Sequence, residues 1–206
     1  MMDPRAVIAA TLENMNRIYR DIGQIVQIIE EKMRNEGFQA IGDAAVTWEV
    51  STAYHSPSSW LYRWFARIFW DDEHPTKAVG YCLHLGNYAR RDEETLIQMG
   101  VSFPFVNVSL LEGFEKAVNT FKRRSDLYNC LWGAGWYEGR EKVTNQAIVE
   151  SRVTYGEVAA LATTYFVDML ALVDDSTIGR LVVEPMVKMF QGDKAVASTL
   201  PVIRLP

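Results

Sequence analysis

Apolar residues recur with a helical period over the first stretch of the chain, residues 4–34. Their spacings alternate between four and three, which is the pattern of a helix with one continuous apolar seam. The seam consists of Ile8, Leu12, Met15, Tyr19, Ile22, Val26, Ile29 and Met33. Asp3 can cap the first turn, Pro4 suits the first helical position, and Gly37 can provide the left-handed residue that closes a helix. We therefore predict a long amphipathic helix within residues 1–36.

The length of this helix leaves two roles open. A helix of about 30 residues measures roughly 45 Å, which exceeds the width of a small sheet, so part of it is expected to project. Ile18, Ile25 and Ile28 widen the apolar stripe, which favours docking into a core. Pairing with a second copy of the helix is the alternative.

Most of the remaining chain has the pattern of β-strands. Alternation of apolar and polar residues is clearest in residues 44–54. Further strands are expected at residues 77–88, 101–111, 127–137 and 143–153. Pro104 cannot donate a ladder hydrogen bond, so the strand around it should lie at an edge, contain a bulge or begin later. Residues 155–173 are almost wholly apolar, and periodicity does not distinguish one long central strand from a buried helix.

Three shorter helices complete the prediction. Residues 60–70 contain three Trp, two Phe and one Tyr, and a helix would gather Arg63 and Arg67 on one narrow stripe. Residues 112–124 have a helical spacing of apolar residues and a basic end. A third helix should begin near Thr177, capped by the preceding aspartates, and Pro185 should kink or stop it. The predicted fold is one α+β domain covering residues 1–206, in which the long N-terminal helix packs on an antiparallel sheet of about five or six strands with two or three further helices.

Composition restricts the classes of partner. The 206 residues are 49% hydrophobic and 23% charged, which suits one domain with a substantial core. The net charge of -5 argues against general nucleic-acid binding. No apolar run is long enough to span a bilayer and no secretion signal is evident, so a cytoplasmic location is expected.

Large aromatic residues are the most unusual chemical feature of the sequence. They can fill a core, or they can line an apolar site for a small apolar or aromatic ligand or for a partner protein. The candidate ligand-binding residues are Trp48, Trp60, Trp64, Trp132 and Trp136. The favoured function is accordingly a non-catalytic ligand-binding or regulatory protein, paired as a homodimer through the first helix or a sheet edge.

A metal-dependent hydrolase is the alternative function. Its candidate ligands are His55, Asp71, His74 and His84, because two histidines and a carboxylate are a common ligand set for zinc or iron. Their spacing matches no known ligand signature, and hydrogen-bonded structural histidines explain them more simply. No nucleophile elbow, dinucleotide fingerprint or phosphate loop is present, so the sequence identifies no cofactor.

Overall fold

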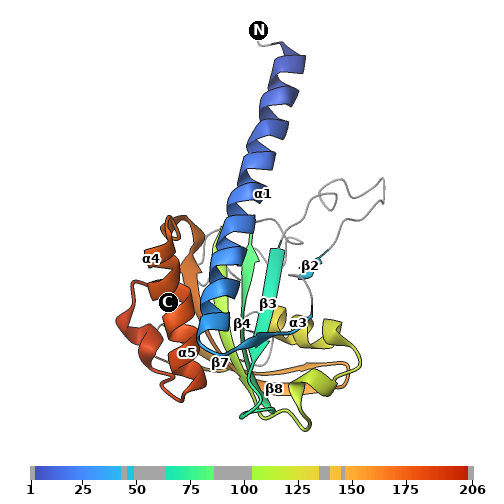
Figure 1. Ribbon diagram of the computed structural model, residues 1–206, viewed down its shortest axis with the longest axis vertical. Helices are drawn as coiled ribbons and strands as arrows, with labels where there is room; N and C mark the ends of the chain where they lie inside the picture. Colours follow the sequence, from blue (N-terminus) through green and yellow to red (C-terminus); the bar gives the residue numbers. More distant parts are fainter. Residues whose placement is uncertain are drawn as a thin grey trace.

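The computed structural model describes residues 3–42, 46–48, 64–85, 104–134, 140–144 and 147–203. A long N-terminal helix packs on an antiparallel sheet together with shorter helices (Figure 1), which confirms the predicted α+β fold. The helices are α1 (Pro4–Asn35), α3 (Arg124–Gly133), α4 (Asp175–Ile178) and α5 (Glu184–Phe190). Single 3₁₀ or π turns form η2 (Val118–Thr120), η3 (Met169–Ala171), η4 (Gly179–Val183) and η5 (Val196–Thr199).

The sheet consists of two antiparallel meanders that meet at its centre. Its strands are β1 (Gln39–Ala40), β2 (Val46–Trp48), β3 (Trp64–Trp70), β4 (Lys77–His84), β5 (Phe105–Glu112), β6 (Arg140–Thr144), β7 (Ile148–Tyr155) and β8 (Val158–Asp168). The order is β1-β3-β4-β5-β8-β7-β6, and β2 also pairs with β3. At the centre, β5 pairs with β8 over its whole length. The short strands β1 and β2 therefore cover successive parts of one edge.

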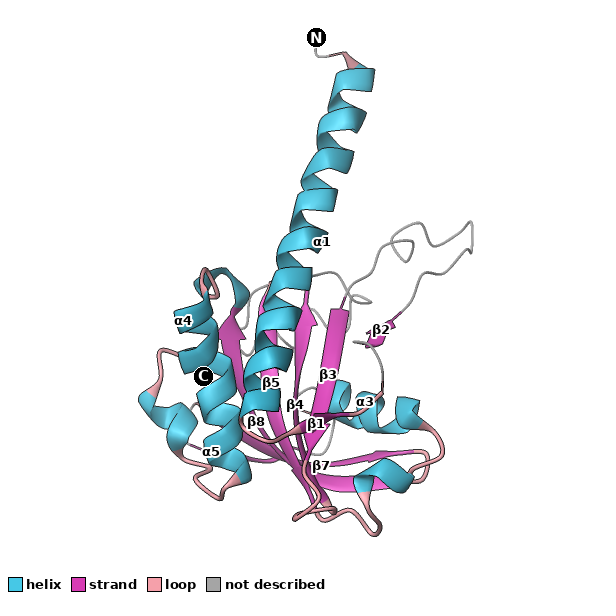
Figure 2. Cartoon of the chain, in the orientation of Figure 1, coloured by secondary structure: helices cyan, strands magenta, loops and turns pink. Residues whose placement is uncertain are grey.

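Both faces of the sheet are covered, which gives the core two layers. One layer packs the second half of α1, η4, α5 and η5 against the sheet. The other packs α3 and the loop after β5 against the opposite face. The shorter helices thus cover both faces of the sheet, since α3 lies on the face opposite α5 (Figure 2).

The two ends of α1 follow the sequence prediction. The Asp3 carboxylate accepts a hydrogen bond of 3.0 Å from the backbone N–H of Arg5. At the other end Gly37 has a φ of +88°, and Phe38 donates its backbone N–H to the carbonyl of Met33 at 3.0 Å. This is the Schellman closure that a glycine after a helix permits.

Only the second half of α1 docks on the sheet, while the first half projects well beyond it (Figure 1). The buried side chains of α1 are Ile22, Ile25, Ile29 and Met33. Two ion pairs hold the docked half: Glu30 pairs with Arg67 of β3, and Lys32 pairs with Asp175 of α4 at 3.1 Å. The helix thus combines core docking with a projecting arm.

Strand β3 occupies a stretch for which a helix was predicted, so that prediction is wrong for Trp64–Trp70; residues 60–63 lie outside the described part. Nearly every β3 side chain is buried because both faces of the strand are covered, which removes the alternation expected of a half-buried strand. Arg67 shares a face with Phe65 and Phe69, and Glu30 of α1 compensates its charge. A partner so distant in sequence cannot be inferred from the segment itself.

The predicted helix at residues 112–124 is also wrong. The chain leaves β5 at Gly113, whose φ of +79° turns it out of the strand. The rings of Phe114 and Phe121 are 5.7 Å apart, and both are buried. The helical spacing of apolar residues therefore reflects anchors of a loop that contains η2.

Three other apolar stretches were predicted with mixed success. Residues 127–137 were predicted to form a strand, but α3 occupies this stretch as far as its described part extends. Because α3 is buried on nearly all sides, its apolar residues show no helical period. Residues 143–153 span a hairpin of β6 and β7, with Ala147 in the turn. Residues 155–173 contain β8, so the strand alternative is correct.

A π-helical turn, η4, joins α4 to α5 and allows the helix to continue past Pro185. Pro185 has no N–H to donate to the carbonyl of Leu181, four residues earlier. The hydroxyl of Tyr165 in β8 donates to that carbonyl instead, at 2.8 Å. As predicted, Asp174 caps the start of this region by accepting a hydrogen bond of 2.7 Å from the backbone N–H of Thr177.

Candidate functional site

Two of the five tryptophans predicted to line a ligand site lie on one side of the sheet. Trp64 in β3 is only 3% exposed and belongs to the core layer under α3. Trp132 in α3 is half-buried and packs against the same layer. The side chain of Trp48, as well as Trp60 and Trp136, lies outside the described residues. The aromatic-lined site therefore stays a prediction.

A chain of buried polar side chains crosses the sheet beneath α3. The Nε2–H of His84 donates to Oδ1 of Asn107 at 2.6 Å, and the Asn107 amide donates to the Leu131 carbonyl in α3 at 3.2 Å. Ser109 and Thr164 continue the network with hydroxyl oxygens 2.8 Å apart. Burial lowers the pKa of His84 to about 3, so its ring is neutral at physiological pH. The network satisfies buried polar groups and ties α3 to the sheet.

The described residues of the alternative metal site do not converge. Asp71 and His74 pair in the turn before β4, where the ring Nδ1 of His74 lies 3.1 Å from a carboxylate oxygen. His84 lies at the far end of β4, and a strand of this length spans roughly 23 Å. His55 lies outside the described residues. Within the part of the chain that is described, no group of three or more His, Cys, Asp or Glu side chains is placed to hold a metal.

The projecting half of α1 exposes a row of large apolar side chains. Those most exposed are Val7 (42%), Ile8 (61%), Leu12 (55%) and Ile18 (48%). Tyr19 is half-buried because its ring meets that of Phe65 edge-on at 6.1 Å. We define the free seam as Ile8, Leu12 and Met15, and it ends where Tyr19 packs on Phe65. It continues, on the same side of the helix, the seam that the docked half buries.

The positions directly beside the free seam on the helix surface carry no charge. The neighbouring positions on either side are occupied by Ala9, Thr11, Asn16 and Ile18. Glu13, Arg17 and Arg20 fall more than a quarter turn away at 100° per residue, and Arg5 approaches the seam only in the first turn. The exposed apolar stripe is therefore bordered by neutral side chains.

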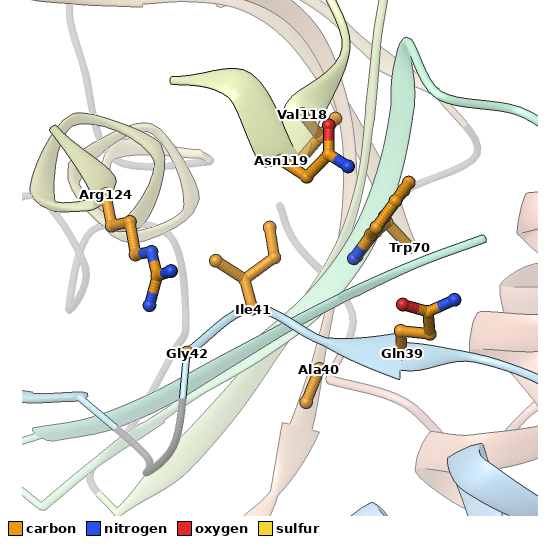
Figure 3. Close-up of a pocket in the computed structure, with 8 residues that line it drawn as sticks. All are labelled: Gln39, Ala40, Ile41, Gly42, Trp70, Val118, Asn119 and Arg124. Atoms are coloured by element: carbon orange, nitrogen blue, oxygen red, sulfur yellow. The ribbon is translucent and has the colours of Figure 1, made fainter. Parts of the chain in front are cut away.

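A cavity of about 260 Å³ opens at the β3 edge, beside the point where the chain leaves β1 (Figure 3). Its principal lining residues are Gln39, Ile41, Trp70, Val118, Asn119 and Arg124. This site was not predicted, because the basic run at residues 122–124 was assigned to the C-terminal end of a helix. Arg124 is instead the first residue of α3. A basic run directly before an apolar stretch was the only available signal.

No protein-family model matches the chain, and comparisons with curated proteins and with solved structures find no match. Among the helices that the structure describes, none is both long and apolar enough to cross a membrane. Function is therefore inferred from the residues of this chain alone.

Proposed function

We propose that this is an interaction protein that forms a homodimer by pairing the projecting half of α1 with the same segment of a second copy. The observation that carries the proposal is the free seam: half of a regular seven-residue apolar pattern is buried on the sheet, and the other half is exposed. A contiguous apolar patch on a protein surface usually marks an interaction site. A helix with such a seam is suited to pack against another helix.

The residues beside the free seam favour a second copy as the partner. In a helix pair, side chains flanking the seam lie opposite one another and decide which helices can meet. Here they are small, polar-neutral or apolar, as in Ala9, Thr11 and Ile18, so two identical helices meet without like-charge repulsion. In an antiparallel pair, Leu12 would face Met15 of the other copy.

The apolar area of the free seam limits the dimer to a weak and reversible one. Its two most exposed side chains are Ile8 at 61% and Leu12 at 55%. Burying that remaining exposure in both copies is worth roughly 3–7 kcal/mol gross at 1.5–3 kcal/mol per fully buried side chain. Met15 adds further contact, whereas the loss of translational and rotational freedom opposes pairing. We therefore expect a dissociation constant of about 100 μM or weaker.

Sedimentation velocity over a concentration series tests the proposal. The wild-type protein should pass from monomer to dimer, whereas Leu12→Glu, which places a charge in the free seam, should stay monomeric. Ala10→Glu is the matched control, because it introduces the same charge on the opposite side of the same exposed helix and should dimerise like the wild type. Circular dichroism should show equal helix content in all three proteins.

Two results would contradict this proposal. One is a wild-type protein that stays monomeric at about 1 mM, above the expected dissociation constant. The other is a Leu12→Glu protein that dimerises as strongly as the wild type. Cosedimentation with anionic lipid vesicles, lost in Leu12→Glu while the wild type stays monomeric, would identify the seam as a membrane-surface helix instead.

A further inference from the structure

We infer that the cavity beside Trp70 binds a small organic carboxylate that carries a short apolar group. The cavity lies on the sheet body, where β1, β3, η2 and α3 meet, and its residues are distinct from the free seam of α1 (Figure 3). This inference is independent of the proposed homodimer.

Part of the cavity wall can contact a small apolar group, although most of the accessible wall is polar. Ile41 projects into its middle in Figure 3, and Val118 of η2 adds apolar surface. The volume of about 260 Å³ lies below the roughly 300–1,000 Å³ of pockets that take drug-sized ligands. The expected ligand is therefore a small molecule, such as a short-chain or aromatic monocarboxylate.

Trp70 provides a hydrogen-bond donor that faces the cavity. Its side chain is only 7% exposed, yet Figure 3 shows the indole nitrogen on the side of the ring that faces Ile41 and the cavity interior. In the part of the chain that is described, no group accepts a hydrogen bond from this N–H. A ligand oxygen in the cavity can take the place of water as its acceptor.

Arg124 provides the positive charge that a carboxylate requires. Its guanidinium extends from the start of α3 toward Gly42, where a Cβ atom would come within 3.2 Å of a guanidinium nitrogen. It forms no ion pair with any residue of the described ranges. The Asn119 amide lies on the side of Ile41 away from Arg124 and can add a neutral hydrogen bond to the ligand. A carboxylate between Trp70 and Arg124 would thus be bound by charge-assisted hydrogen bonds.

The local electrostatic field also favours an anion. Lys122 and Arg123 precede Arg124 at the N-terminus of α3, which is the positive end of its dipole, and Asp126 is the acidic residue of its first turn, so positive charge predominates there. Arg123 at the N-cap makes no side-chain capping hydrogen bond. Cations at this end oppose helix stability, whereas a bound anion would interact favourably with both the helix dipole and the cations. The Asp72 carboxylate accepts a hydrogen bond of 2.8 Å from the side-chain amide of Gln39, a lining residue.

A two-dimensional ¹H–¹⁵N NMR titration tests the inference through the indole N–H resonance of Trp70, assigned from its loss in Trp70→Phe. The probes are butyrate and benzoate, with benzamide as the uncharged counterpart of benzoate. The carboxylates should shift this resonance with a dissociation constant of about 1 mM, which is usual for ligands of so few atoms. Arg124→Gln should weaken binding at least about tenfold.

Arg123→Gln is the matched control, because it removes the same charge one residue away, outside the cavity lining, and should change the affinity less than about twofold. The inference is overturned if neither carboxylate shifts the Trp70 resonance, or if benzamide binds as well as benzoate. It is also overturned if Arg123→Gln weakens binding as much as Arg124→Gln, because the effect would then be general charge attraction. Stronger binding of inorganic phosphate than of either carboxylate would also overturn the inference, because it would identify the ligand as a phosphate.

Discussion

Replacing Tyr165 by Phe should destabilise the fold by about 1–3 kcal/mol, although it removes only one hydroxyl group. That hydroxyl is the donor to the Leu181 carbonyl, at 2.8 Å, in the helical segment that Pro185 interrupts. Since Pro185 cannot donate, the substitution leaves the buried carbonyl of Leu181 without its donor. The expected cost is the desolvation penalty of an unsatisfied polar group.

Tyr81→Phe is the matched comparison. Tyr81 is also fully buried and lies in the same core layer, but its hydroxyl has no hydrogen-bond partner among the described residues. Burial and the nearby Glu30 carboxylate raise its pKa, so the hydroxyl stays protonated. Removing it should leave stability unchanged or increase it. The same chemical change is therefore expected to have different consequences at Tyr81 and Tyr165.

A double-mutant cycle isolates the role of Pro185. In the Tyr165→Phe protein, Pro185→Ala restores a backbone N–H that can donate to the Leu181 carbonyl. The change in unfolding free energy caused by Pro185→Ala should therefore be about 1 kcal/mol more stabilising in the Tyr165→Phe protein than in the wild type. Urea unfolding followed by circular dichroism gives the free energies, provided the slope with denaturant is unchanged. Equal losses in Tyr81→Phe and Tyr165→Phe, or strictly additive effects of Tyr165→Phe and Pro185→Ala, would refute the reasoning.

The other predictions concern pH and a tight turn. Between pH 7 and pH 5 the free energy of unfolding should fall by about 2 kcal/mol, because unfolded His84 binds a proton below its ordinary pKa of about 6.5, whereas the folded ring resists protonation until about pH 3. Urea titrations at the two pH values measure this fall, which should be smaller in His84→Gln. Gly156→Ala should lower stability more than Gly113→Ala by at least about 1 kcal/mol. Both glycines have positive φ, but only at Gly156 would a Cβ atom meet the buried Asp126 carboxylate, at 2.2 Å. Equal losses in thermal unfolding would show that this carboxylate can move aside.

Elements with strong local signals could be predicted from the sequence. The ends of α1 depend on Asp3, Pro4 and Gly37, which act within a few residues of their own positions. Residues 64–70 and 127–133 were assigned to the wrong class because their surroundings come from other parts of the fold. Once both faces of the sheet are covered, a buried strand and a buried helix are both apolar on all sides, and neither keeps its period.

The candidate sites differ in the same way. The free seam belongs to one continuous segment, so its apolar pattern is visible in the sequence. Which part of the pattern is buried depends on how far the sheet extends along α1: Ile22 is buried and Leu12 is exposed. The carboxylate cavity brings together Ile41, Trp70 and Arg124 from three separate parts of the chain. No spacing rule connects residues that meet only after the sheet has formed.

Because the docked and projecting halves of α1 are one uninterrupted helix, they share a single angular phase. Each residue advances the helix by 100°, and a seven-residue repeat drifts by only about 20° per repeat in a straight helix. From Ile29, which rests on the sheet, to Met15 in the free seam there are two such repeats. The free seam is therefore turned only about 40° from the direction of the sheet. The direction in which the docked half faces the sheet therefore also sets the direction of the free seam. A molecule bound there would lie on the same side of the helix as the sheet, above the strand ends.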